Sequence, residues 1–311
     1  MPPPDPSVVR IDGPWRHLHV HANGIRFHVV EADPGPGSDP DRPLVILLHG
    51  FASFWWSWRH QLRHVRGARV VAVDLRGYGD SDKPPRGYDG WTLAGDTAGL
   101  VRALGHQSAT LVGHADGGLV CWATSVLHPR AVRAIALVSS PHPLALRTES
   151  LARGDQRSAL LTWMLRYQVP RWPEHVLTRN DGAEVERLMR LRSGPKWVAN
   201  QDFSETARYM RQAIQIPSAA HSTLEYQRWA VRSQLRTEGW RFMKSMKRPL
   251  TVPILHLRGD LDPYVLADTV ELSKRYAPHG HYVSVGGAGH FAHEEEPESV
   301  NKLLSDYLAQ L

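Results

Sequence analysis

Cysteine is almost absent from this chain of 311 residues, which contains only Cys121. A single cysteine excludes an intramolecular disulfide framework and is typical of proteins from a reducing compartment. Cys121 falls within a predicted helix, so we interpret it as a buried thiol of the core rather than as a catalyst.

Long apolar runs are also missing. Runs such as Leu44–Leu48 are far shorter than the roughly 20 residues that a membrane-spanning helix needs. The N-terminal stretch MPPPDPSVVR has no basic segment followed by an apolar run, so it shows no secretory signal. These features predict a cytoplasmic protein without a transmembrane segment. Residues 1–14 are rich in proline and are predicted to be poorly ordered.

Acidic residues are fewer than basic ones, and the formal net charge is +6. Basic residues are densest in a stretch from 228 to 248, where Arg228, Arg232 and Arg236 follow helical spacing. A solvated helix face is the favoured interpretation, and a weak contact with an anionic surface is the alternative.

The chain has no zinc-finger spacing and no RNA-binding signature, so we expect no nucleic-acid partner. We expect no cofactor, and the sequence leaves the oligomeric state open.

Apolar strand patterns alternate with helical patterns along most of the chain. Asn23-Gly24 between two alternating runs predicts a β-hairpin, since both turn residues need positive φ. The continuously apolar runs that follow indicate a mostly parallel sheet flanked by helices. This α/β core is predicted to comprise residues 15–140 and 247–311. Residues 141–246 lack strand patterns and form a predicted helical cap, inserted where open α/β sheets bind ligands.

Three histidines of the first hairpin strand, His17, His19 and His21, fall on one face. Their spacing allows a metal site, but an exposed strand face is the favoured interpretation. We therefore predict no metal site in this chain.

The stretch LVGHADGGLV, residues 111–120, predicts a sharp corner between a strand and a helix. Such corners hold a nucleophile at the centre of a small-x-nucleophile-x-small pattern. The central residue here is Ala115, whose side chain has no nucleophilic atom. Asp116 follows it, in the first turn of the helix, where the helix dipole favours a carboxylate, and a catalytic role for Asp116 is the alternative.

Two further residues at predicted strand ends carry chemistry. Asp262 lies in RGDLDPYV and His290 lies in GGAGHFAHEEEP. Nucleophile, acid and histidine follow one another in this order in the α/β-hydrolase fold. We prefer Asp262 to Asp260 as the acid because it lies beyond the turn.

The loop HGF, residues 49–51, follows the strand Leu44–Leu48. In this fold the backbone N–H groups of such a loop and of the residue after the nucleophile form the oxyanion hole. Here they belong to Phe51 and Asp116.

These motifs together resemble the epoxide-hydrolase and haloalkane-dehalogenase branch of the α/β-hydrolases. The resemblance covers roughly residues 15–310 and rests on HGF, DLRGYGDSDKP, GH-x-x-GG, SSPHP, GDLDPYV and GHFAHEEEPE, in that order. It implies aspartate at the centre of the corner in epoxide hydrolases and serine in relatives that act on esters. Ala115 departs from both. A corner centred on Asp116 would place His114 at a position that must be small.

The resemblance also implies two cap tyrosines that hydrogen-bond the epoxide oxygen. The first matches Trp163, with Tyr167 one turn away, and the second matches Leu235. We therefore expect Trp163, Tyr167 and Leu235 to line a mostly apolar substrate pocket. If tryptophan and leucine replace the tyrosines, the epoxide oxygen has no donor, and Ala115→Ser is expected to restore more activity than Ala115→Asp.

Three hypotheses account for Ala115. In the favoured one the protein is an epoxide-hydrolase-like hydrolase that cleaves an apolar epoxide or ester weakly or through water activated by His290. In the second the protein is an inactive pseudohydrolase that binds a small molecule. In the third the chain is a nucleophile-to-alanine variant of an active enzyme.

Overall fold

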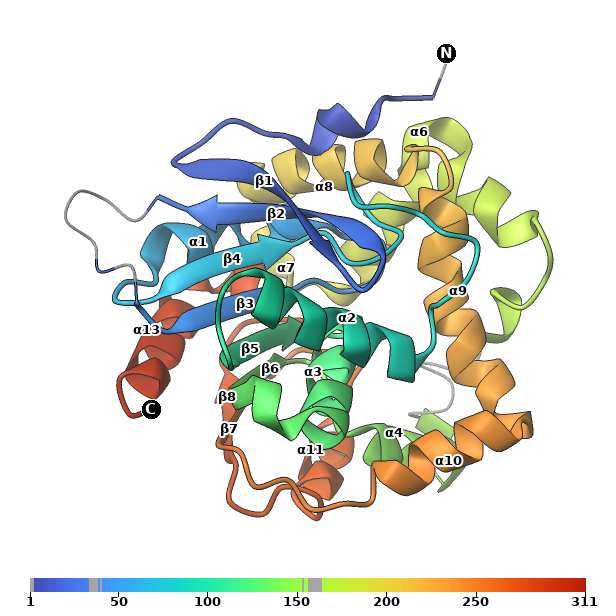
Figure 1. Cartoon of the computed structure of the whole chain (residues 1–311). Coiled ribbons are helices and arrows are strands. Elements are labelled where there is room, and N and C mark those ends of the chain that lie inside the picture. Colours follow the sequence, from blue (N-terminus) through green and yellow to red (C-terminus); the bar gives the residue numbers. More distant parts are fainter. Residues whose placement is uncertain (1–2, 34–38, 40, 153, 156–163) are drawn as a thin grey trace.

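An eight-stranded sheet forms the centre of the computed structural model, which describes residues 3–33, 39, 41–152, 154–155 and 164–311 (Figure 1). The strands lie in the order β1-β2-β4-β3-β5-β6-β7-β8. Their bounds are β1 Trp15–Ala22, β2 Ile25–Ala32, β3 Leu44–Leu48, β4 Arg69–Val73, β5 Ala109–His114, β6 Val132–Val138, β7 Ile254–Gly259 and β8 His281–Val285. From β4 to β8 all neighbouring strands are parallel, and only β1 and β2 are antiparallel to their neighbours. The predicted α/β fold with a mostly parallel sheet is confirmed.

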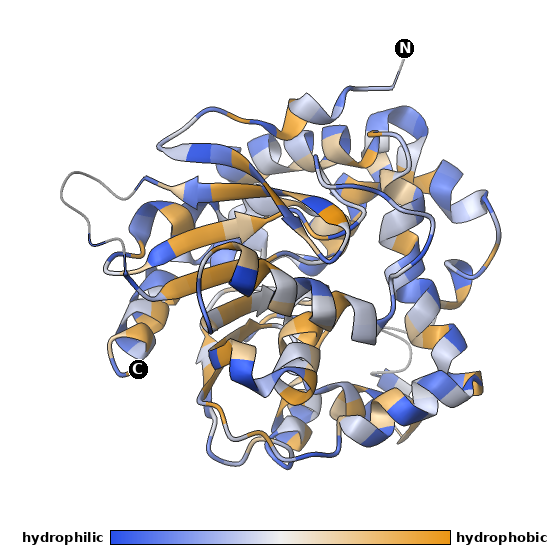
Figure 2. Cartoon of the chain, viewed as in Figure 1, coloured by the Kyte–Doolittle hydropathy of each residue, from blue (hydrophilic) through white to orange (hydrophobic). Residues whose placement is uncertain are grey.

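The predicted hairpin joins β1 and β2. Ala22 pairs with Ile25, and the two turn residues between them have positive φ, 50° at Asn23 and 74° at Gly24. The strands that follow are buried over most of their length because helices cover both faces of the sheet, and every residue of β3 is buried. Figure 2 shows these central strands as mostly hydrophobic.

Helices lie on both faces of the sheet (Figure 1). Helices α2 and α3 pack on one face, and α1 and α13 pack on the other, so each face has its own apolar layer. Cys121 is buried in α3, as predicted. The bounds are α1 Arg59–His64, α2 Gly90–Ala103, α3 Asp116–Leu127, α11 Ala267–Ser273, α12 Ala292–Glu295 and α13 Pro297–Leu308.

The chain between β6 and β7 is helical in the part that the structure describes. Its helices are α4 Pro143–Ala152, α6 Trp172–Arg192, α7 Pro195–Val198, α8 Gln201–Ile214, α9 Ala219–Arg232 and α10 Thr237–Ser245. All of them fall within the range 141–246 that the sequence predicted to be helical. Helix α6 is broken at 179–182, where three consecutive residues have positive φ. No helix of the described residues is long and apolar enough to cross a membrane.

The proline-rich N-terminus differs from the expectation of poor order. Residues Pro6–Val9 form a short 3-10 helix, and Val9 is buried. The indole N–H of Trp55 donates to the carbonyl of Val9, and Arg10 forms an ion pair with Asp80. One apolar side chain and two polar contacts thus anchor a segment whose composition alone indicated disorder.

The basic stretch also differs in part from the expectation of a solvated face. Arg228 is buried and forms an ion pair with Glu174. Its guanidinium also donates to the carbonyl of Tyr167, so it ties α9 to the chain that precedes α6. Arg232 and Arg236, further along the stretch, are more exposed.

The histidines of β1 are not uniformly exposed. His19 and His21 are exposed, whereas His17 is partly buried and hydrogen-bonds to buried His28. His19 contacts the carboxylate of Asp80. Among the described residues no group of three or more histidine, cysteine or acidic side chains is arranged to hold a metal ion.

Candidate active site

Ala115 occupies the sharp corner between β5 and α3. Its φ of 46° and ψ of −112° lie in a region that non-glycine residues rarely adopt, and such backbone strain is typical of functional sites. Close packing explains the glycines nearby. A Cβ on Gly117 would lie 2.2 Å from the carbonyl oxygen of Leu48, and one on Gly113 would lie 2.5 Å from the Gly118 nitrogen. The predicted strained corner is confirmed.

Asp262 and His290 meet at the carboxyl ends of β7 and β8. The Nδ1 atom of His290 lies 2.9 Å from Oδ2 of Asp262, which is a hydrogen bond between the predicted acid and the predicted histidine. The other carboxylate oxygen accepts from the backbone N–H groups of Tyr264 and Val265. Burial alone would raise the pKa of Asp262, but the charge and hydrogen bond of His290 and these two N–H groups hold the pKa below its usual value.

The remaining ring nitrogen of His290, Nε2, has no hydrogen-bond partner among the described residues. Asp260, the competing acid, is exposed and accepts instead from the N–H of Gly287. The geometry therefore favours Asp262, which fixes the histidine tautomer that carries its proton on Nδ1.

A small cavity brings the corner and the histidine together. Residues of the sheet domain line one side, and Tyr167, Arg192 and Gln227 from the helical segment line the other. The lining residues of the sheet domain are Phe51, His114, Ala115, Asp116, Tyr264, His290 and Phe291. The cavity thus lies between the carboxyl edge of the sheet and the helices inserted after β6.

Asp116 extends into this cavity from the first turn of α3. The amide of Gln227 donates to its Oδ2 atom at 2.7 Å. Burial raises the pKa of Asp116 to about 6, and the Gln227 hydrogen bond and the charges of Arg192 and His290 oppose that rise. A carboxyl group with a pKa near neutral in a cavity fits proton transfer as well as helix capping.

Phe51 and Asp116 line the same cavity as Ala115. Neither backbone N–H donates to a protein acceptor among the described residues. The loop before Phe51 is held because the N–H of Leu75 donates to Nε2 of His49. His114 contacts the carbonyl of His290 through its Nε2 atom. The oxyanion role of the two N–H groups stays a prediction.

The three predicted pocket residues have different outcomes. Trp163 lies outside the described residues. Tyr167 lines the cavity and is buried, and its hydroxyl has no hydrogen-bond partner among the described residues. Leu235 was predicted wrongly, because its side chain is 89% exposed. Leu235 lies eight residues after Gln227, which corresponds to about 12 Å along a helix. This distance places Leu235 away from the cavity.

Two residues with a place at the site were not identified from the sequence. Glu295 in α12 accepts hydrogen bonds from the N–H groups of Gly194, Gly289 and Phe291, which joins the end of the α6 segment to the His290 loop. Arg192 ends α6, and its carbonyl accepts from the N–H of His290. Glu295 lies within the motif GHFAHEEEPE, but the motif does not indicate a role for it. No local sequence pattern identifies Arg192 as a residue of the site.

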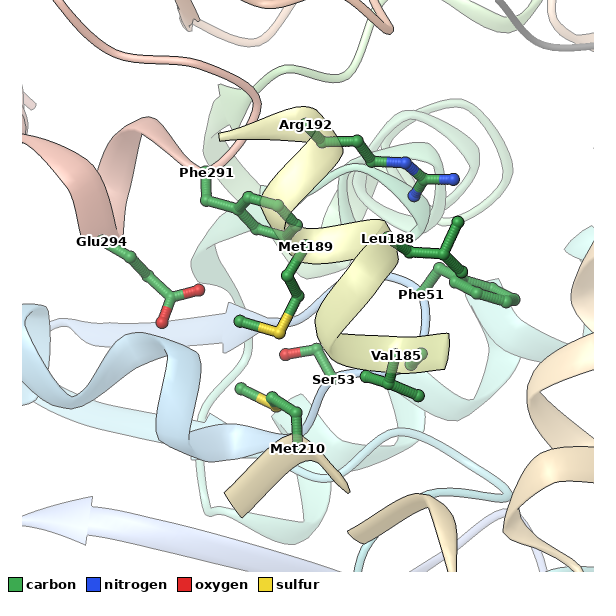
Figure 3. Close-up of a pocket in the computed structure, with 10 residues that line it drawn as sticks. Phe51, Ser53, Val185, Leu188, Met189, Arg192, Met210, Phe291 and Glu294 are labelled. Atoms are coloured by element: carbon green, nitrogen blue, oxygen red, sulfur yellow. The ribbon is translucent and has the colours of Figure 1, made fainter. Parts of the chain in front are cut away.

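A second cavity adjoins the first and shares Phe51, Arg192 and Phe291 with it (Figure 3). Its other walls are mostly apolar, and they are formed by Ala52, Val185, Leu188, Met189 and Met210, with Ser53 and Glu294. Burial raises the pKa of Glu294 to about 7 despite its ion pair with Arg59.

Comparison with known proteins agrees with this arrangement. The family described as the alpha/beta hydrolase fold matches residues 43–297. A mouse protein named epoxide hydrolase 4 is 29% identical over 98% of this chain and 81% of its own length. The AB hydrolase superfamily protein YfhM of Bacillus subtilis is 31% identical over 93% of this chain and 96% of its own length. The crystal structure of epoxide hydrolase A from Mycobacterium thermoresistibile superimposes with a TM-score of 0.74 at 26% identity, covering 95% of this chain and 98% of that one. The chain therefore belongs to the α/β-hydrolase fold family, in its epoxide-hydrolase-like branch.

Proposed function

We propose that this protein hydrolyses an apolar epoxide or ester slowly, through water activated by His290. The observation that carries the proposal is the His290–Asp262 hydrogen bond, with the second ring nitrogen left beside Ala115 and the cavity. An imidazole oriented in this way by a carboxylate is a general base.

For an epoxide, the proposed reaction begins with a water molecule beside His290. Nε2 of His290 takes a proton from water, and the water oxygen forms a bond to an epoxide carbon. The C–O bond of the ring breaks, and its oxygen takes a proton from a donor on the opposite side of the cavity, for which we propose the hydroxyl of Tyr167. The proton on His290 then returns to the phenolate through solvent, which restores both residues.

For an ester, Nε2 of His290 takes a proton from water while the water oxygen bonds to the carbonyl carbon, and the backbone N–H groups of Phe51 and Asp116 stabilise the oxyanion. When the oxyanion collapses, the ester C–O bond breaks, and the leaving alcohol takes the proton from Nε2 of His290. The charge of Asp116 opposes that oxyanion. Loss of the nucleophile in a triad enzyme costs on the order of 10⁶ in kcat, so we expect slow turnover.

The helices between residues 141 and 246 act in this proposal as the cap of the site. Support comes from Tyr167, Arg192 and Gln227, which line the same cavity as Ala115. A cap in this position excludes bulk water and holds the substrate against the sheet edge.

A panel of epoxides and esters tests the proposal on the parent protein and on His290→Gln. We expect the parent to hydrolyse some member of the panel above the rate in buffer, and His290→Gln to lower that rate more than about tenfold. The matched control is His279→Gln, an exposed histidine that should leave the rate unchanged.

The competing hypothesis is a binding protein without catalysis, which the missing nucleophile at Ala115 favours. It predicts that panel members bind the parent and are released unchanged. Binding without turnover above the rate in buffer would overturn the proposed hydrolysis.

A further inference from the structure

Arg192 lines both cavities of the site. Figure 3 shows it in the second of them. Only 9% of its surface is exposed. Its guanidinium packs on the ring face of Tyr264, with 4.1 Å between the guanidinium carbon and the ring centroid. A cation on an aromatic face keeps its N–H donors available at its edge.

Among the described residues, no carboxylate forms an ion pair with Arg192, and its guanidinium has no hydrogen-bond partner. The residues outside the description contain no aspartate and no glutamate, so they supply no carboxylate side chain either. Arg192 is therefore a buried cation without a counter-ion in the chain.

The other buried arginines each form an ion pair with a carboxylate, unlike Arg192. Arg59 forms ion pairs with Glu294 and Asp202, Arg76 forms one with Asp96, and Arg228 forms one with Glu174. Burial of a charge without a partner is costly, and folded proteins satisfy nearly all such charges internally. Arg192 therefore lacks a counter-ion that a bound anion would supply.

Asp116 does not fill that role. It lines the same cavity, but its carboxylate accepts from Gln227 and forms no ion pair with Arg192. The cavity thus offers one uncommitted cation next to one carboxylate. That balance suits a singly charged anion better than a dianionic phosphate, which Asp116 would repel.

We propose that the substrate carries a carboxylate that binds Arg192, while its reactive bond lies beside His290. The inference rests on the proposed hydrolase function and narrows its substrate from a purely apolar molecule to an amphipathic monocarboxylate. The planar fork of the guanidinium matches a carboxylate through two parallel hydrogen bonds. The apolar remainder fits the second cavity, against Leu188, Met189 and Met210.

Binding of an unreactive pair of probes tests the inference without turnover. The probes are 3-phenylpropanoate and its neutral amide, 3-phenylpropanamide, which share a shape and differ in charge. Isothermal titration should give the carboxylate an affinity about tenfold or more above that of the amide. Arg192→Gln should remove this preference and leave the affinity for the amide within about twofold.

Arg192→Lys keeps the charge but loses the fork, so it should retain part of the preference. The matched control is Arg190→Gln, an exposed arginine of the same helix, which should leave the preference intact. Equal binding of the two probes to the parent, or a preference that survives Arg192→Gln, would overturn the inference. Neither result depends on hydrolysis, so failure here is distinct from failure of the His290 experiment.

Discussion

At the scale of single residues, the charge of Asp116 is in conflict with its environment in the cavity beside Ala115. Burial raises the pKa of its carboxyl group from the ordinary value of 3.8 to about 6. The folded protein therefore binds the Asp116 proton more tightly than the unfolded chain does. Stability falls as the pH rises from about 4 to about 6, because the folded state must then bury a charge.

Asp116→Asn removes this titration and keeps an oxygen that can accept from Gln227. Relative to the parent, the free energy of unfolding of the variant should rise by about 2 kcal/mol between pH 4 and pH 7, since one pKa unit corresponds to about 1.4 kcal/mol. Urea denaturation at the two pH values measures this difference. A difference between the two proteins that is the same at both pH values would contradict the assigned environment of Asp116.

The sequence predicted some residues of the site and not others, for a physical reason. Ala115, Asp262 and His290 follow strands whose apolar runs are easily recognised, and parallel strands bring their carboxyl ends to one edge. Leu235 and Arg192 lie on helices instead. Whether a helical residue reaches the cavity depends on where the helix breaks and how it crosses the sheet, and no local pattern specifies either.

At the scale of elements, three hydrogen bonds to Glu295 join the helical segment to the His290 loop. The helical segment and the His290 loop approach each other closely at this junction, since a Cβ on Gly289 would lie 2.5 Å from the carbonyl oxygen of Arg192. Glu295 receives N–H groups from Gly194 on one side and from Gly289 and Phe291 on the other. We infer that this carboxylate positions His290 and the end of α6 relative to each other.

Glu295→Ala leaves those three N–H groups without their acceptor. We expect the free energy of unfolding to fall by about 3 kcal/mol, and amide exchange to accelerate at Gly289 and Phe291. The matched control is Glu296→Ala, whose partner Lys196 is exposed, with an expected cost below about 1 kcal/mol. Equal effects of the two substitutions would show that Glu295 has no special role in this junction.

The elements themselves were mostly predictable. The hairpin at Asn23-Gly24 and the apolar runs of the sheet are local patterns, and both are confirmed. The N-terminal segment was not predictable, because its order depends on Val9 and Arg10 meeting residues far along the chain. The buried role of Arg228 has the same cause, since its partner Glu174 lies 54 positions earlier.

At the scale of the whole molecule, the site combines an intact edge of the sheet with a helical segment that supplies Tyr167. Replacement of both cap tyrosines, by Trp163 and Leu235, would leave an epoxide oxygen without a donor and would favour Ala115→Ser over Ala115→Asp. Tyr167 lines the cavity, and its hydroxyl has no partner among the described residues. With Tyr167 as donor, we now expect both substitutions to restore activity.

The most direct test of this account is the rate of epoxide hydrolysis by Ala115→Asp, compared with the parent and with the double variant Ala115→Asp/His290→Gln. If the site lacks only its attacking atom, Ala115→Asp should exceed the parent by at least about a hundredfold on some epoxide, with His290 needed to release the covalent ester. A folded Ala115→Asp protein that hydrolyses no epoxide faster than the parent would contradict the claim, because it would mean that the site has lost more than its nucleophile.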